Sequence, residues 1–255
     1  QIDLLVLEST YGNSRHQEPE TTRAELVDFI RDTTENRKGS VILPSFALGR
    51  AQELLKLILK GKEEGDLRDD VPVFVDGMIK SINPIYQEHA DFDLPLDAVL
   101  EVRGEADREE IAREAKKVPS IIVTTSGMLT GGPVVEYVRH LLPDARHRIV
   151  LTGYQDEGAP SRALLDISGA GGPRVVRLPG EGGEIRFKAA MPAKQFGLSA
   201  HADRPGLLEY ASRLKPKQIA LVHGAPWQQQ DLSKGLALNH PGAVISCGPD
   251  QVEVG

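Results

Sequence analysis

Short apolar runs rich in valine and isoleucine alternate with longer segments of helical periodicity along most of this chain. The apolar runs are residues 2–7, 40–44, 71–77, 120–127, 148–154 and 218–224. Apolar residues at successive positions are typical of strands buried on both faces of a sheet. Helical periodicity occurs in a segment that contains Leu26 and Ile30 and in residues 50–60, 133–142 and 205–214. Because parallel strands need helical crossovers, this alternation predicts an α/β fold with a mostly parallel sheet and helices on both faces.

Charge and cysteine content exclude several classes of protein. The formal net charge is −7 and the pI is about 5.6, so any contact with nucleic acid needs a local basic patch. No apolar run approaches the roughly 18 residues of a membrane span. The single cysteine, Cys247, excludes an intrachain disulfide and is typical of a reducing compartment such as the cytoplasm. Residues 1–10 carry no signal-peptide features and begin inside a strand pattern without methionine, so we expect an excised or processed piece.

Three polar side chains stand at positions that favour one shared site. Glu8 ends the first apolar run, and His223 lies at the end of the run 218–224. His201 precedes the helix 205–214, which Asp203 can cap. Ligands of parallel sheets bind at the edge where the strands end. The two histidines are 22 positions apart, which is enough for one helix that leaves this edge and one strand that returns to it. We therefore expect all three side chains at one edge.

The spacing of the histidines is not by itself a metal signature. No H-x-H or H-E-x-x-H motif occurs in the sequence, and two packed histidines remain an open alternative to a site. Gly197 and Gly224 flank the pair and would allow close backbone approach. The other histidines are expected at the surface, in polar loops or at helix ends: His16, His89, His140, His147 and His240.

Two strand-to-helix junctions are candidates for anion binding. Residues 126–133, SGMLTGGP, form a glycine-rich turn before a helix, where backbone N–H groups can hold a phosphate. Residues 45–52 place Ser45 and Arg50 at a second junction. Plain chain reversal is the alternative explanation of such turns. The substrate-binding candidates are Ser126, Gly127, Gly131, Gly132 and Arg50, with Arg162 as a further phosphate contact.

Six motifs in order give the chain a family resemblance. They are ESTYG (8–12), LPSFALGRAQELL (43–55), TTSGMLTGGPVVEYVRHL (124–141), LTGYQDEGAPSRALLD (151–166), GLSAHAD (197–203) and LVHG (221–224). With these motifs the chain resembles the β-CASP members of the metallo-β-lactamase superfamily. It is most similar to the prokaryotic relatives of the cleavage and polyadenylation specificity factor nuclease.

The resemblance implies a fold and a division of the chain. We expect a Rossmann-like β-CASP domain over 13–181, inserted into the C-terminal half of a metallo-β-lactamase αββα domain formed by 1–12 and 182–255. Residues 167–185 contain eight prolines and glycines and are interpreted as a loop, a hairpin and a domain boundary. In that family the nuclease site lies between the two domains.

The resemblance also implies catalytic roles. His223 matches a ligand of one zinc ion in a pair, and His201 matches the histidine that contacts the scissile phosphate and protonates the leaving oxygen. Glu8 matches the acidic residue that orients His201. A carboxylate partner suits a general acid because it fixes the orientation of the ring. Two metals can stabilise both the attacking and the leaving oxygen in phosphodiester hydrolysis.

The chain departs from the family pattern in two ways. The family's H-x-H-x-D-H motif, its third histidine and its bridging aspartate would all precede Glu8, so they fall outside these 255 residues. Ala225 also stands where the family has a glutamate after LVHG. Zinc sites use three or four protein ligands, so we expect the chain alone to hold zinc poorly and to be inactive.

Two functions remain open. In the first, the chain is part of a zinc-dependent ribonuclease that cuts single-stranded RNA. In the second, it belongs to a non-catalytic β-CASP protein that binds RNA or pairs with an active nuclease. A dinucleotide-binding domain is excluded because no G-x-G-x-x-G follows a predicted strand. We expect no membrane partner, and the oligomeric state stays open, a homodimer included.

Overall fold

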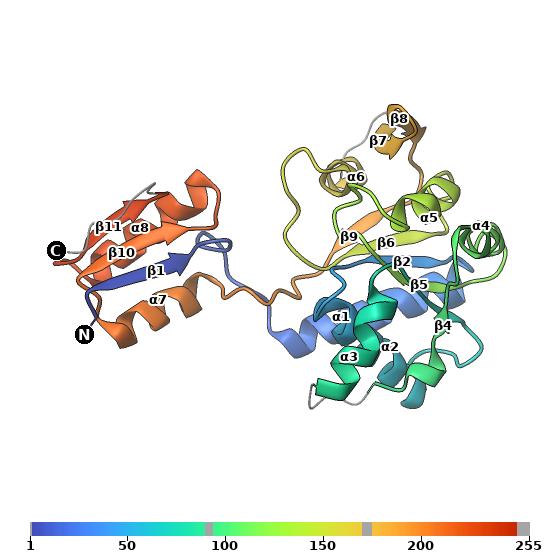
Figure 1. Ribbon diagram of the computed structural model, residues 1–255, viewed down its shortest axis with the longest axis horizontal. Helices are drawn as coiled ribbons and strands as arrows, with labels where there is room; N and C mark the ends of the chain where they lie inside the picture. The colour runs from blue at the N-terminus through green and yellow to red at the C-terminus, as the bar shows by residue number, and fades with distance from the viewer. Residues whose placement is uncertain (1, 90–93, 170–174, 249–255) are drawn as a thin grey trace. The chain divides into compact units, whose positions relative to one another are not determined.

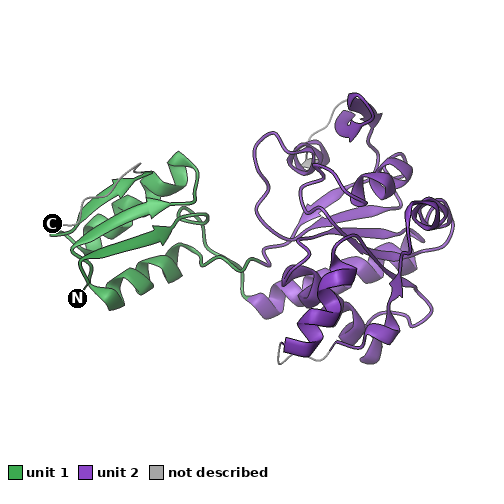
Figure 2. Cartoon of the chain, viewed as in Figure 1, with its two compact units in different colours: residues 1–18, 199–255 green, residues 19–198 purple. Residues whose placement is uncertain are grey.

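The chain forms two compact units in the computed structural model, which describes residues 2–89, 94–169 and 175–248 (Figure 1). Unit 1 combines residues 1–18 with 199–255, and unit 2 is the continuous segment 19–198 (Figure 2). Unit 2 is therefore an insertion between the two segments of unit 1. Within the described ranges, no helix is long and apolar enough to cross a membrane.

Unit 2 is built on a six-stranded sheet in which every pair of neighbouring strands is parallel. The strand order is β4-β3-β5-β2-β6-β9. The bounds are β2 Val41–Pro44, β3 Val73–Asp76, β4 Leu100–Glu101, β5 Ile121–Thr124, β6 Arg148–Leu151 and β9 Ala193–Gln195. The predicted mostly parallel sheet is confirmed.

Helices cover both faces of this sheet (Figure 1). One face packs against α1 (Pro19–Arg31), α2 (Arg50–Glu63) and α3 (Ile79–His89), and the other against α4 (Glu105–Glu114), α5 (Val134–Leu141) and α6 (Pro160–Gly169). A π-helical turn, η1 (Asp32–Asn36), continues α1, and a 3₁₀ turn, η2 (Leu96–Ala98), precedes β4. Strand residues alternate between the two layers: Val41 and Leu43 join the first core cluster, whereas Ile42 joins the second. Burial on both faces explains why the strands are apolar at successive positions.

A hairpin follows α6 in unit 2. Strands β7 (Val175–Gly180) and β8 (Gly183–Lys188) pair antiparallel through a two-residue turn, as predicted for 167–185, although 167–169 still belong to α6 and 170–174 lie outside the described residues. The chain then returns to the large sheet, because β9 pairs with β6 and Phe196 and Leu198 join the first core cluster. The compact unit therefore runs over 19–198, whereas the sequence predicted a domain over 13–181 with its boundary in the hairpin.

Unit 1 is a three-stranded parallel sheet with two helices. The order is β1-β10-β11, with bounds β1 Leu4–Glu8, β10 Gln218–Val222 and β11 Val244–Cys247. Helices α7 (Arg204–Leu214) and α8 (Pro226–Asn239) pack on the sheet through an apolar cluster. That cluster contains Leu5, Leu7, Leu207, Ala211, Ile219, Leu221, Leu232 and Leu236. In the register of β1 and β10, Glu8 pairs with Val222, so the two strands end side by side.

One predicted surface histidine is buried. The side chain of His147 has no exposed surface, and its Nδ1 accepts a hydrogen bond from the backbone N–H of Ser40 at 2.9 Å. Burial of the imidazole lowers the pKa of His147, because the charged form loses its hydration. The polar neighbours Arg146 and Arg148 in the sequence led to the wrong prediction. The other four are exposed or partly exposed: His16, His89, His140 and His240.

Candidate active site

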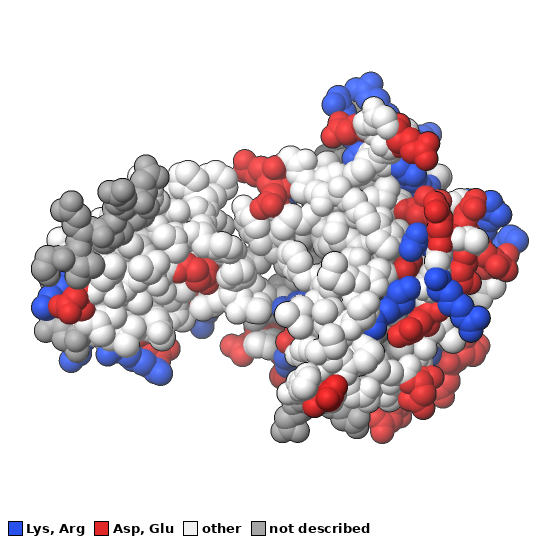
Figure 3. All heavy atoms as spheres, viewed as in Figure 1, with Lys and Arg blue, Asp and Glu red and all other residues white. Residues whose placement is uncertain are grey.

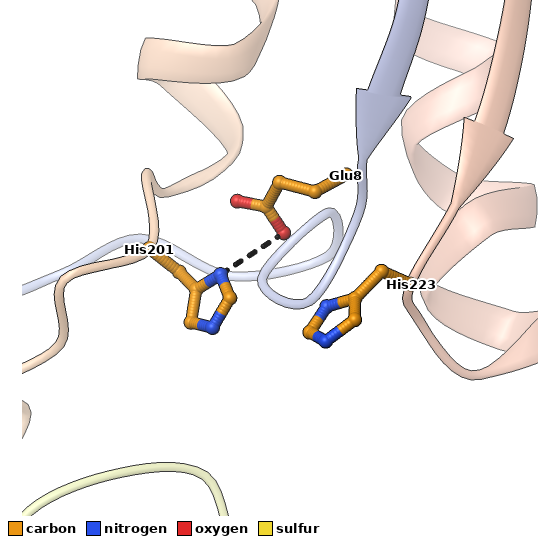
Figure 4. Close-up of side chains that lie close together, drawn as sticks. All are labelled: Glu8, His201 and His223. Carbon is orange, nitrogen blue, oxygen red and sulfur yellow. Dashed lines mark ion pairs between the residues drawn. The ribbon is translucent and has the colours of Figure 1, made fainter.

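Glu8, His201 and His223 come together in unit 1 (Figure 4). Each offers one potential ligand atom, and the three atoms lie within 4.8 Å of one another. Glu8 is the last residue of β1, and His223 directly follows β10. The expectation of one shared sheet edge suggested a strand end for His201 as well. His201 lies instead in the loop before α7. The nearest preceding strand, β9, ends at Gln195 and belongs to the other unit.

His201 is paired with Glu8. Its Nδ1 lies 3.4 Å from the Oε2 of Glu8, and the two side chains are 39% and 28% exposed. The ring of His201 also stacks on that of His223, with centroids 5.3 Å apart and an interplanar angle of 23°. Figure 4 shows the Nδ1 of His201 turned toward the carboxylate and its other ring nitrogen turned away.

Thr10 contacts all three of these residues. Its backbone N–H donates to the Oε2 of Glu8 at 2.7 Å. Its Oγ1 lies 3.0 Å from the Nδ1 of His223 and 3.4 Å from the Nδ1 of His201. Thr10 is buried, with 5% of its surface exposed. Sequence reasoning missed this residue, although its place between Glu8 and Gly12 in ESTYG was a local signal.

Asp203 and His16 hold the loop that carries His201. Asp203 caps α7 as predicted, because its Oδ1 accepts the backbone N–H of Gly206 at 3.0 Å. Its Oδ2 accepts the backbone N–H of His16 at 3.1 Å, and the Nε2 of His16 lies 3.1 Å from the carbonyl oxygen of His201. Partial burial opposes ionisation of Asp203, but the two N–H bonds outweigh it and hold the pKa of this carboxyl below its usual value. The sequence predicted His16 only as a surface residue, with no part in the site.

The ends of β1 and β10 approach closely at Gly224. The Oγ of Ser9 donates to the carbonyl of Val222 at 2.7 Å. A Cβ on Gly224 would lie 2.5 Å from that Oγ and 2.7 Å from the carbonyl oxygen of Ser9, so the predicted close approach is confirmed here. A Cβ on Gly197 would have no described atom within 4 Å apart from its chain neighbours, so the same prediction is wrong for Gly197.

The residues predicted to bind substrate lie in unit 2, where β2 and β5 run side by side and bring both junctions to one edge. The Oγ of Ser126 donates to the carbonyl of Gly131 at 3.0 Å, within the loop itself. Arg50 begins α2 with its side chain 14% exposed, and it pairs with Glu53. A Cβ on Gly132 would lie 3.1 Å from the carbonyl oxygen of Thr125, and its φ of 80° favours glycine in the turn itself, whereas a Cβ on Gly127 would meet Ser45 at an ordinary contact distance of 3.6 Å. Arg162 pairs with Asp166 at 3.0 Å.

The donor set of the Glu8–His201–His223 cluster suits zinc. Imidazole nitrogens and carboxylate oxygens are zinc ligands in proteins, and catalytic sites keep three protein ligands with a fourth position open. Within the described ranges, these three side chains form the one such cluster of histidine, cysteine, aspartate and glutamate side chains. A zinc pair needs more ligands than these three residues supply.

Two known domain families match the chain. The Beta-Casp domain matches residues 51–164, all within unit 2. The Zn-dependent metallo-hydrolase RNA specificity domain matches residues 187–242, which include His201 and His223. The second match spans the end of unit 2 and most of the C-terminal segment of unit 1.

Several curated proteins have similar sequences. The chain is 36% identical to the transcription termination factor FttA of Methanothermobacter thermautotrophicus, over 92% of this chain and 39% of that protein. It is 35% identical to the RNase J-like protein of Methanocaldococcus jannaschii, over 89% of this chain and 53% of that protein. The FttA of Thermococcus kodakarensis is 33% identical, with coverage of 92% and 38%. The chain spans about two fifths to one half of the length of these relatives.

The matched domains agree with the architecture. The Beta-Casp match falls on the inserted parallel-sheet unit, and the metallo-hydrolase match covers both histidines of the cluster. The relatives extend the similarity over about nine tenths of the chain. This chain belongs to the β-CASP family of the metallo-β-lactamase superfamily.

Proposed function

We propose that this chain is part of a zinc-dependent ribonuclease that hydrolyses phosphodiester bonds of single-stranded RNA. The observation that carries the proposal is the pairing of His201 with Glu8 beside the ring of His223. Two similarities support it: the RNA specificity domain that matches 187–242, and the relative named RNase J-like protein. An RNA substrate also favours the cytoplasm as the compartment.

His201 acts as the general acid in this proposal. Its Nδ1 pairs with the carboxylate of Glu8, so the ring keeps one orientation and a proton on Nε2 would face the leaving group. Water attacks phosphorus and loses one proton to the solvent as the new P–O bond forms, the bond from phosphorus to the leaving oxygen breaks, and the Nε2 proton passes to that oxygen. Glu8 stays ionised throughout and stabilises the cationic ring before the transfer.

His223 serves as a zinc ligand through its Nε2 in the same proposal, with further ligands from outside the cluster. When bound, zinc lowers the pKa of a coordinated water and stabilises charge on the phosphoryl oxygens. His223 lies in the left-handed region with φ of 49°, which is uncommon for a residue other than glycine. Such conformations cluster at functional sites, where the surrounding structure holds them in place.

Unit 2 contributes RNA contacts in this proposal through the junctions at 45–52 and 126–133. Figure 3 shows acidic and basic side chains intermixed on the visible face of unit 2, so this face offers RNA no broad basic surface. Backbone N–H groups of the loop around Gly131 and Gly132, and the guanidinium of Arg50, are the proposed phosphate partners. The hydroxyl of Ser45 is buried and finds no hydrogen-bond partner among the described residues.

The test is cleavage of end-labelled single-stranded RNA by the complete gene product that contains this chain, purified with zinc. We expect His201→Ala to lower the single-turnover rate by about a hundredfold or more while bound zinc is retained. We expect His223→Ala to lower both the zinc content and the rate. The matched control is His89→Ala at the exposed end of α3, which should change neither quantity. Zinc content and rate that both survive in His223→Ala would contradict the proposal.

The second candidate is RNA binding without cleavage. The relatives named transcription termination factor favour it, because that name specifies an action on transcription and no hydrolysis. The same experiment separates the two functions. A complete gene product that binds the labelled RNA and leaves it intact, with zinc present, would support the binding function.

A further inference from the structure

The hydroxyl of Thr10 lies between two groups of the same residue, His223. The Oγ1 atom is 3.0 Å from the carbonyl oxygen of His223 and 3.0 Å from its Nδ1. Two further bonds fix the backbone of Thr10: its N–H donates to Glu8 at 2.7 Å, and its carbonyl accepts from the side-chain amide of Gln228. The hydroxyl is therefore held in place by β1 on one side and by α8 on the other.

The protons on these groups can be assigned by counting donors. A threonine hydroxyl has one proton and two lone pairs, and a backbone carbonyl can only accept. The Thr10 hydroxyl therefore donates to the carbonyl of His223, and its lone pairs face the ring. A nitrogen 3.0 Å from a lone pair is stabilised when it carries a proton, so the neutral ring of His223 is protonated on Nδ1. Its Nε2 then carries the free lone pair.

The same count applies to His201. The Nδ1 of His201 lies 3.4 Å from the Oε2 of Glu8 and 3.4 Å from the Thr10 hydroxyl. An ionised carboxylate only accepts, and the hydroxyl proton is already used, so Nδ1 of His201 must supply the proton. Both stacked rings thus direct Nδ1–H toward Thr10, and Figure 4 shows the other nitrogen of each ring turned away from Glu8.

We propose that Thr10 is a positioning residue, which fixes His223 in the Nδ1–H tautomer and so presents its Nε2 lone pair to a metal ion. Histidines that bind metal usually donate their other N–H to a protein group, which sets the tautomer and the ring orientation. Thr10 would set the tautomer and the ring orientation of His223, as Glu8 does for His201. The bond from Thr10 to the His223 carbonyl also stabilises the left-handed backbone that aims the ring.

This inference rests on the proposed function, because that function assigns the free Nε2 of His223 to a metal ion. Its direct readout needs neither metal nor RNA. The alternative is that the hydroxyl donates to the Nδ1 of His223, which places the ring proton on Nε2 and blocks coordination there. Among the described residues, the carbonyl of His223 would then keep the backbone N–H of Ser9 alone, at 3.4 Å. The two arrangements differ in the position of one proton, which nitrogen NMR can read.

The experiment is a long-range proton–nitrogen correlation spectrum of this chain with ¹⁵N-labelled histidine, recorded metal-free at a pH where the ring is neutral. Single His→Gln variants assign the signals of His201 and His223. We expect Nδ1–H as the sole tautomer of His223 in the unchanged chain and in Thr10→Ser, which keeps the hydroxyl. In Thr10→Val, which keeps the shape and loses the hydroxyl, we expect a mixture of both tautomers.

Controls make the outcomes separable. Thr33→Val removes a buried hydroxyl that bonds within a helix of unit 2, and it should leave the His223 signals unchanged. An Nε2–H tautomer in the unchanged chain would overturn the inference, and so would an unaltered tautomer in a folded Thr10→Val. If Thr10→Val fails to fold, the unchanged chain and Thr10→Ser still decide the matter. The ribonuclease proposal would fail separately, by retention of activity and zinc in His223→Ala.

Discussion

The imidazole of His201 lies against the carboxylate of Glu8, with Nδ1 and Oε2 3.4 Å apart, although 193 positions separate the two residues in the chain. The carboxylate sits at the end of β1, and the histidine sits in the loop that leads into α7. Insertion of unit 2 separates them in sequence without separating them in space. The pair therefore links the two chain segments that build unit 1.

Glu8→Gln tests the orienting role of this carboxylate. The amide keeps the size of the side chain but loses the negative charge, and it can present an N–H to His201 instead of an acceptor. We expect the complete gene product to lose about tenfold to a hundredfold in single-turnover RNA cleavage. The control is Glu20→Gln, an exposed residue of α1 that pairs with Arg23. An unchanged rate in Glu8→Gln would show that His201 needs no carboxylate.

The 255-residue chain alone should not cleave RNA. In the proposed site Glu8 and His201 pair with each other and His223 is the cluster's zinc ligand, whereas zinc sites use three or four protein ligands. We expect less than one equivalent of zinc after purification and no cleavage of labelled single-stranded RNA with added zinc. Metal analysis and a cleavage assay check both points. Cleavage by this chain that His201→Ala abolishes would overturn the expectation.

Parallel-sheet rules predicted much of the architecture. Consecutive valine and isoleucine residues marked β2, β3, β5 and β6, because strands covered on both faces leave no polar periodicity. The same rules brought Glu8 and His223 to one edge. Strand β9 gave no such signal, because three residues at the edge of a sheet, two of them polar, resemble a loop, and the predicted domain over 13–181 therefore does not include it.

The sequence did not predict the long-range hydrogen bonds. Thr10 and His223 are 213 positions apart, and although ESTYG marks Thr10 as a site candidate, the motif does not show which distant ring its hydroxyl contacts. The burial of His147 depends likewise on Ser40, 107 positions away. Such contacts follow from how loops at strand ends fold back, which short-range propensity does not encode.

The buried ring of His147 should make unit 2 less stable in mild acid. Its pKa is lowered from 6.5 by burial, with Arg146 and Lys116 acting in the same direction and Asp144 opposing them. Below about pH 6.5 the unfolded chain binds a proton that the folded chain resists, so stability falls as the pH drops through 6.5 toward the folded pKa. Urea unfolding at pH 7.5, 6.5 and 5.5 measures this change in stability. These pH values span the pKa of free histidine, which is about 6.5.

His147→Gln should flatten this pH dependence, although the loss of the packed ring lowers stability at every pH. His89→Gln is the matched control, because His89 is exposed at the end of α3 and should leave the pH dependence unchanged. A slope that persists in His147→Gln would assign the acid sensitivity to other groups.

Gly224→Ala should destabilise unit 1, because a methyl group there would lie 2.5 Å from the Oγ of Ser9 and 2.7 Å from its carbonyl oxygen. The backbone cannot yield without weakening the bond from Ser9 to Val222 at the ends of β1 and β10. We expect a loss of about 1–3 kcal/mol in the free energy of unfolding. Gly197→Ala adds the same methyl group where no described atom beyond its chain neighbours lies within 4 Å, and it should cost less than about 0.5 kcal/mol. Urea denaturation of both variants checks the difference, and equal stabilities would contradict a close approach at Gly224.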